Sequence, residues 1–171
     1  MITQFNCHNY NNKPIDMDRM IFTEIITPLL VKENLPVINW LKEIFLIPME
    51  RNCVNCNQNL QWTERKDLKD GYVWSCRTKN CSQYKQKISI RKGTIFANSN
   101  LSLQTWVHLI YCWCSEFSEK QTVDLTNVSR RTVQEIFSGF RLACTTFFKE
   151  NPVRLGGPGV IVQIDESCFS H

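Results

Sequence analysis

The sequence predicts an α+β fold, in which a small sheet and a set of helices occupy separate stretches of the chain. Residues 60–90 hold three short β-prone runs, and two cysteine pairs accompany them. Apolar residues recur at helical intervals before this stretch and again over 102–142, and a last apolar run at 160–164 is typical of a buried strand. With 43% hydrophobic and 21% charged residues among 171, the composition is that of a globular protein.

The first 50 residues predict small helices. We expect coil over 1–15, a helix over about 16–26, and a second short helix from Thr27-Pro28, because proline suits the first helical position. A further helix is expected over Val37–Phe45, with Pro36 just before its start. Nothing in this stretch indicates chemistry.

The two cysteine pairs have the spacing of a metal site. Cys53 and Cys56 form a C-x2-C pair, Cys76 and Cys81 form a C-x4-C pair, and nineteen residues separate the two pairs. Four thiolates at such spacing suit one tetrahedral Zn²⁺, because two sulfurs of one short turn reach the same ion. The alternative is two disulfides or four unrelated thiols.

Strand patterns around the cysteines predict a zinc ribbon. Leu60–Thr63 and Tyr72–Cys76 form the expected hairpin, with Asp70-Gly71 as turn residues before the second strand. Lys87–Ile90 alternates polar and apolar residues as a third strand. The intervening hairpin then brings the second cysteine pair opposite the first.

The other cysteines are expected to be reduced. The chain has nine cysteines but no signal-peptide pattern at its start, so we expect a reducing intracellular compartment, the nucleus if the source is a eukaryote. Cys112, Cys114 and Cys144 fall on helical segments, where cysteine usually serves as a small core residue. No apolar run approaches the ~18 residues that span a bilayer, so we expect no membrane partner.

Positive charge is concentrated on the expected ribbon. The net charge of the chain is +4, but residues 51–100 carry ten basic and three acidic side chains, a net charge of +7. A local excess of this kind attracts nucleic acid, with Arg91 and Lys92 as candidate contacts. The alternative is a solvated lysine-rich surface.

Two helices after residue 118 predict a helix-turn-helix. A preceding helix, capped by Asn100 or Ser102, carries an apolar stripe: Trp106, Leu109, Ile110, Trp113 and Phe117. Ser118 and Gln121 then fit a capping box, Asn127 suits a left-handed turn, and Ser129 suits the cap of the next helix.

The apolar side of that last helix is predicted to hold Val133, Ile136, Phe137, Phe140 and Leu142. Arg130, Arg131 and Gln134 open the helix, where they would meet phosphates and base edges of DNA. The alternative is an ordinary helical hairpin whose arginines face water.

The order of these parts resembles that of the Merlin-type and ISXO2-like DDE transposases. The resemblance runs from about residue 35 to the end, and Asp70-Gly71-Tyr72-x-Trp74-x-Cys76, Ser89–Phe96 and Gln163–Ser167 contribute to it. It implies recognition of transposon ends by the ribbon and the helix-turn-helix. It also implies an RNase H-like domain that cuts and joins DNA with three acids and Mg²⁺, of which Asp165 would be the first acid.

Two of the three acids expected by this resemblance are missing from the chain, so we expect no transposase activity from these residues alone. We therefore expect a DNA-binding portion of a transposase-like protein. The alternatives are the front part of an active Mg²⁺-dependent transposase and a zinc-ribbon adaptor for another protein. The expected partner is DNA, and self-association is left open.

We expect four segments. They are an N-terminal helical lead-in (1–50), the zinc ribbon (51–97), a helical domain with the helix-turn-helix (98–152), and a linker with the first strand of a truncated RNase H-like domain (153–171).

Overall fold

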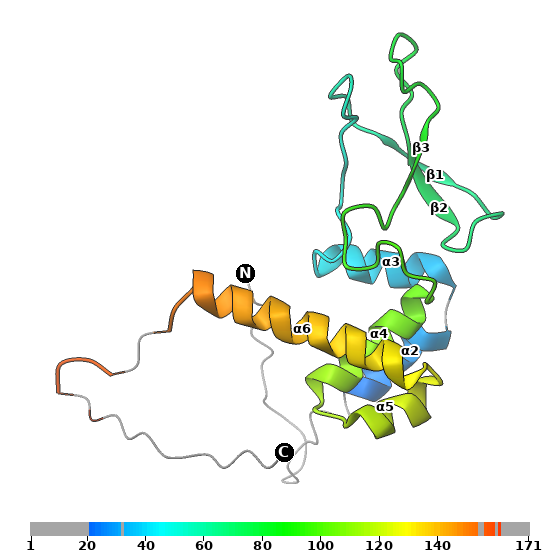
Figure 1. Ribbon diagram of the computed structural model, residues 1–171. Coiled ribbons are helices and arrows are strands. Elements are labelled where there is room, and N and C mark those ends of the chain that lie inside the picture. Colours follow the sequence, from blue (N-terminus) through cyan, green and yellow to red (C-terminus); the bar gives the residue numbers. More distant parts are fainter. Residues whose placement is uncertain (1–20, 32, 154–155, 160, 162–171) are drawn as a thin grey trace, which may run out of the picture. The chain divides into compact units, whose positions relative to one another are not determined.

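The computed structural model describes residues 21–31, 33–153, 156–159 and 161 (Figure 1). It combines helices with one small antiparallel sheet, which confirms the predicted α+β class. The chain divides into two compact units, residues 1–127 and 128–171. Asp165 and the predicted strand at 160–164, apart from the exposed Ile161, lie outside the described residues.

Three helical segments open the described part of the first unit. The π-helix η1 spans Ile21–Ile26, α2 spans Thr27–Val31 and α3 spans Asn34–Glu43. α2 begins at Thr27, one residue before the predicted first helical residue Pro28, and α3 begins before the predicted Val37. Pro36 therefore lies in the first turn of α3. A proline is tolerated there because the first four N–H groups of a helix have no partner within the helix.

The three strands form one sheet in the order β1-β2-β3. β1 spans Gln61–Glu64, β2 spans Tyr72–Ser75 and β3 spans Lys87–Ser89, and both pairings are antiparallel. Gly71 ends the connection between β1 and β2 with φ at +74°, a conformation that glycine adopts without strain. The predicted hairpin and its turn are thus confirmed.

An aromatic row on the sheet contacts helix α3. Trp62 of β1 pairs with Trp74 of β2, and their ring centroids are 4.8 Å apart in an edge-to-face arrangement. The ammonium of Lys42, near the end of α3, lies 3.4 Å from the centroid of the Trp62 ring and 5.1 Å from that of Trp74. Partial burial lowers the pKa of Lys42. A cation over two indole faces joins α3, drawn beneath the sheet in Figure 1, to the strands.

Replacing Lys42 by alanine is expected to lower the free energy of unfolding by about 1–2 kcal/mol, the strength of a partly desolvated cation–π contact. Urea denaturation measures this. Lys42→Arg should keep most of the stability, because a guanidinium also stacks on indole rings. Lys66→Ala, at a lysine side chain that is 88% exposed, serves as the control. Equal stability of the Lys42→Ala and Lys66→Ala variants would contradict the contact.

Helix α4 is the centre of the helical part of the first unit. It spans Leu103–Cys114 and contacts η1, α2, α3 and α5, the last of which spans Glu119–Thr126. The Ser102 hydroxyl accepts from the Thr105 N–H, and Ser118 and Gln121 form the predicted capping box. The buried residues of α4 are Leu103, Trp106, Val107, Leu109 and Cys112.

The predicted aromatic stripe on α4 is internal only in part. Trp106 and Leu109 are buried, whereas Ile110 and Trp113 are half-buried; Phe117, also half-buried, lies beyond the end of α4. Trp106 packs edge-to-face on the fully buried Phe96, with 5.4 Å between ring centroids. This contact holds the chain that follows β3 against α4.

In the second unit, helix α6 spans Arg130–Glu150 and the Ser129 hydroxyl caps it by accepting from the Thr132 N–H. Before it, Asn127 has the predicted left-handed conformation, with φ at 54°. Val133 and Phe137 are buried, but Leu142 is exposed. The prediction for Leu142 was wrong because it follows Phe140 by two residues, which places it on the other side of a helix with 3.6 residues per turn.

The three helix cysteines differ in burial. Cys112 is buried, and burial raises the pKa of its thiol, whereas Cys114 and Cys144 are exposed. The expectation of a core position thus holds for Cys112 alone. Cys114 follows Cys112 by two residues and so faces the other side of α4.

Over the ranges that the structure describes, none of the helices combines the length and the apolar character needed to cross a membrane.

Candidate metal centre

Four cysteine sulfurs converge at the sheet. Cys53 and Cys56 lie in the loop before β1, Cys76 directly follows β2, and Cys81 lies between β2 and β3. All four Sγ atoms lie within 4.8 Å of one another. Cys53, Cys76 and Cys81 are buried, and Cys56 is half-buried. The four predicted ligands are therefore brought together.

The sulfur distances fit a tetrahedral thiolate site. Cys53 Sγ is 3.8 Å from Cys81 Sγ, and Cys56 Sγ is 3.8 Å from Cys76 Sγ. Four sulfurs at a metal–sulfur distance of ~2.3 Å stand about 3.8 Å apart in a tetrahedron. A disulfide needs an S–S distance of about 2.05 Å, so neither pair is a disulfide. The group is positioned to hold a metal ion and is compatible with zinc.

Backbone hydrogen bonds fold both cysteine loops. In the first loop the Cys53 N–H donates to the Gln58 carbonyl at 2.8 Å and the Asn57 N–H to the Cys53 carbonyl at 2.9 Å. In the second the Lys85 N–H donates to the Cys76 carbonyl at 2.8 Å. Asn57 and Lys85 both have positive φ, at 54° and 62°, which closes each loop. The loops thus present paired sulfurs to one point.

Neighbouring donors surround the sulfurs. The Asn55 amide and the Gln83 backbone N–H each donate to Cys81 Sγ at 3.3 Å. The Thr78 hydroxyl lies 3.6 Å from Cys56 Sγ, within hydrogen-bonding distance. Such donors stabilise thiolate charge and orient the ligands. Asn55 and Thr78 lie inside the two cysteine motifs and Gln83 lies two residues after the second motif, but the sequence alone did not indicate which groups would face a sulfur.

The thiols of Cys56 and Cys76 differ in acidity. A backbone hydrogen bond from Gln58, with the Thr78 hydroxyl, lowers the pKa of Cys56 to about 6. A backbone hydrogen bond from Thr78 lowers the pKa of Cys76, but burial and the three neighbouring sulfurs outweigh it and raise that pKa to about 11. Thiolates at this distance repel one another, because they carry like charges. A bound metal ion offsets that repulsion.

Arg91 is a buried structural residue and not a surface contact. Its side chain is 8% exposed and donates two hydrogen bonds, of 2.7 and 2.6 Å, to the Asp70 carboxylate. It also donates to the carbonyls of Ser99 and Leu101, at 3.1 and 2.8 Å. Four of its donor contacts are therefore made inside the protein. Because this guanidinium is paired and largely buried, its position does not support the expectation that Arg91 contacts DNA.

The other predicted contact residues are exposed. Lys92 is exposed in the turn that follows β3, in the first unit. In the second unit, Arg130, Arg131 and Gln134 are exposed in the first turns of α6, where Arg131 pairs with Glu135 at 3.0 Å. The predicted catalytic residue Asp165 lies outside the described residues.

Comparison of the chain with protein-family models, with curated proteins and with solved structures finds no match.

Proposed function

We propose that the protein binds DNA as the recognition portion of a transposase-like protein, through a zinc ribbon and a helix-turn-helix. The observation that carries the proposal is the four-cysteine group on a three-stranded antiparallel sheet, in the most basic stretch of the chain. The ordered resemblance to DDE transposases supplies the class of partner.

Zinc is the metal that we propose for the site. A set of four thiolates favours a soft or borderline metal over Mg²⁺ or Ca²⁺, and a tetrahedral group with no open position is typical of structural zinc. The cysteines then serve to hold the fold together, and the metal takes no part in a reaction.

The helices on either side of Asn127 support the second half of the proposal. α5 and α6 are separated by only three residues, 127–129, and both start with well-formed caps. The N-terminus of a helix favours anions, because its N–H groups and its dipole point outward. Arg130 and Arg131 add two positive charges to that end of α6.

Replacing both Arg130 and Arg131 by alanine is expected to weaken binding to a DNA duplex about tenfold at moderate salt. Each lost phosphate contact also lowers the slope of log K against log salt by about 0.9, so the slope should fall by about two. Fluorescence anisotropy with a labelled duplex at several salt concentrations measures both quantities.

The matched control is Arg141→Ala, which removes an exposed arginine further along the same helix. It should leave the slope within the error of the wild type. If the wild-type protein shows no detectable DNA binding at low salt, the proposal is wrong. If the Arg141→Ala variant loses as much DNA affinity as the double variant, the N-terminus of α6 has no specific role in binding.

The adaptor alternative depends on an accessible aromatic surface. The stripe that it would use runs along α4, where Trp106 is buried and Trp113 is half-buried, and its last residue, the half-buried Phe117, follows the end of the helix. A salt-insensitive protein complex without any DNA mobility shift would favour the adaptor nevertheless.

A further inference from the structure

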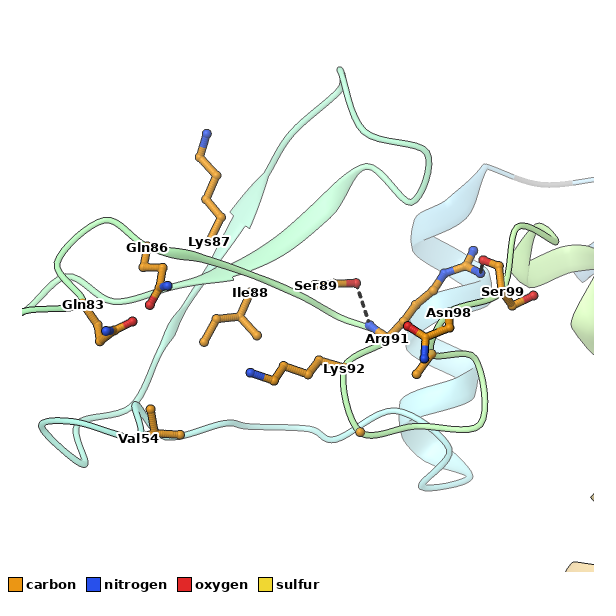
Figure 2. Close-up of a pocket in the computed structure, with 12 residues that line it drawn as sticks. Val54, Gln83, Gln86, Lys87, Ile88, Ser89, Arg91, Lys92, Asn98 and Ser99 are labelled. Carbon is orange, nitrogen blue, oxygen red and sulfur yellow. Dashed lines mark hydrogen bonds between the residues drawn. The ribbon is translucent and has the colours of Figure 1, made fainter.

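A hollow of about 730 Å³ lies beside the metal centre (Figure 2). Its walls come from β3, from the turns that follow it, and from both cysteine loops. Its lining includes Val54, Gln83, Gln86, Ile88, Lys92 and Asn98. Among the described residues that line it there is no aspartate or glutamate.

The positive charge of the hollow comes chiefly from Lys92. Figure 2 shows the Lys92 side chain extending across the hollow between Ile88 and Val54, while Lys87 points away from it. Arg91 also turns away, toward its ion pair with Asp70. The guanidinium of Arg51 donates to the Lys92 carbonyl and adds a second cationic group nearby. The hollow therefore favours an anionic ligand.

Neutral groups complete the lining. Gln83, Gln86 and Asn98 present amides, which can both donate and accept hydrogen bonds. Ile88 and Val54 are apolar, and Val54 is 89% exposed. A nucleotide unit combines an anionic phosphate, hydrogen-bonding base edges and flat apolar faces, so its chemistry matches all three parts of the lining.

Both cysteine loops hold walls of the hollow. Val54 lies between Cys53 and Cys56, and the Gln83 N–H donates to Cys81 Sγ at 3.3 Å. The position of Val54 and of Gln83 thus depends on the loops that the metal ties together. Metal binding and the shape of the hollow are coupled for this reason.

We propose that this hollow binds a segment of a DNA strand, with Lys92 on a phosphate and the amides on base edges or sugar. The inference rests on the DNA binding proposed above and adds a contact site that lies apart in the sequence from Arg130 and Arg131. It also explains how an exposed valine in a cysteine loop can serve recognition, since it offers an apolar contact at the rim.

Two substitutions test the hollow by different signatures. Lys92→Ala is expected to weaken binding to a short fluorescein-labelled duplex about fivefold and to lower the salt slope by about 0.9, because one phosphate contact is lost. Gln86→Ala is expected to weaken binding two- to fivefold, on the order of one hydrogen bond, with the salt slope unchanged. Lys66→Ala removes the same charge as Lys92→Ala from a connection that does not line the hollow.

The outcomes separate this inference from the proposed function. If Lys92→Ala behaves like Lys66→Ala while the Arg130 and Arg131 variant loses affinity, the hollow is overturned and DNA binding stands. If the wild-type protein binds no DNA, both the proposed function and the DNA site in the hollow are wrong. Lys92 and Gln86 are exposed, so both variants should keep the wild-type zinc content and circular dichroism, and a variant that does not is replaced by Lys92→Gln or Gln86→Ser.

Discussion

A Cys76→Ser chain is expected to lose the zinc that we propose for its four-cysteine group and the folded structure of residues 51–96. The three-stranded sheet is small, and structural zinc contributes on the order of 10 kcal/mol of coupled folding energy in sites of this kind. Serine leaves three thiolates and a hydroxyl that does not ionise near neutral pH. Near-ultraviolet circular dichroism follows the loss of fixed packing at Trp62 and Trp74. Elemental analysis measures the loss of zinc.

The control for this variant is Cys144→Ser, because Cys144 is exposed on α6 and takes no part in the four-cysteine group. It should keep one zinc ion and the wild-type spectra. A Cys76→Ser protein with full zinc content and unchanged spectra would rule out the role given to Cys76.

The Arg91→Ala variant is expected to show the second-largest loss, about 3–5 kcal/mol of the free energy of unfolding. Removing one partner of a buried ion pair leaves the other charge buried without compensation. Here the Asp70 carboxylate, only 14% exposed, would be left alone, and the carbonyls of Ser99 and Leu101 would lose their donor. Urea denaturation measures the loss.

Two further variants distinguish loss of the ion pair from the effect of removing any basic side chain in this stretch. The double variant Asp70→Ala with Arg91→Ala should be less destabilised than the two single losses added together, since it removes both charges. Lys92→Ala, at the neighbouring exposed lysine, should change stability by less than about 0.5 kcal/mol. If Arg91→Ala lowers the free energy of unfolding by less than about 1 kcal/mol, the ion pair does not hold the sheet to the segment that leads into α4.

Local patterns were enough to predict the hairpin, the cysteine group and the helix caps. Each of these depends on residues close in sequence: Ser118 with Gln121, Ser129 with Thr132, and Cys53 with Cys56. The rule that two cysteine pairs around a hairpin face one another supplied the single long-range step.

The role of Arg91 could not be predicted in the same way. Its partner Asp70 lies 21 residues earlier, and the sequence identified Asp70 only as a turn residue beside Gly71. A basic stretch suggests exposed charge, and nothing local distinguishes a buried arginine from Lys92 beside it. The hollow was equally hidden, because its lining comes from three separate stretches that only the folded sheet brings together.

Titration of the metal-free protein with Co²⁺, followed by displacement with Zn²⁺, is the most direct measurement on the metal centre. Cobalt reports its ligands by absorption, and tetrahedral thiolate coordination has a characteristic spectrum. We expect saturation at one ion per chain with the spectrum of four thiolates, full displacement by zinc, and loss of this spectrum in Cys76→Ser but not in Cys144→Ser. The absence of saturable binding, or the same spectrum in Cys76→Ser, would contradict a metal centre built from Cys53, Cys56, Cys76 and Cys81.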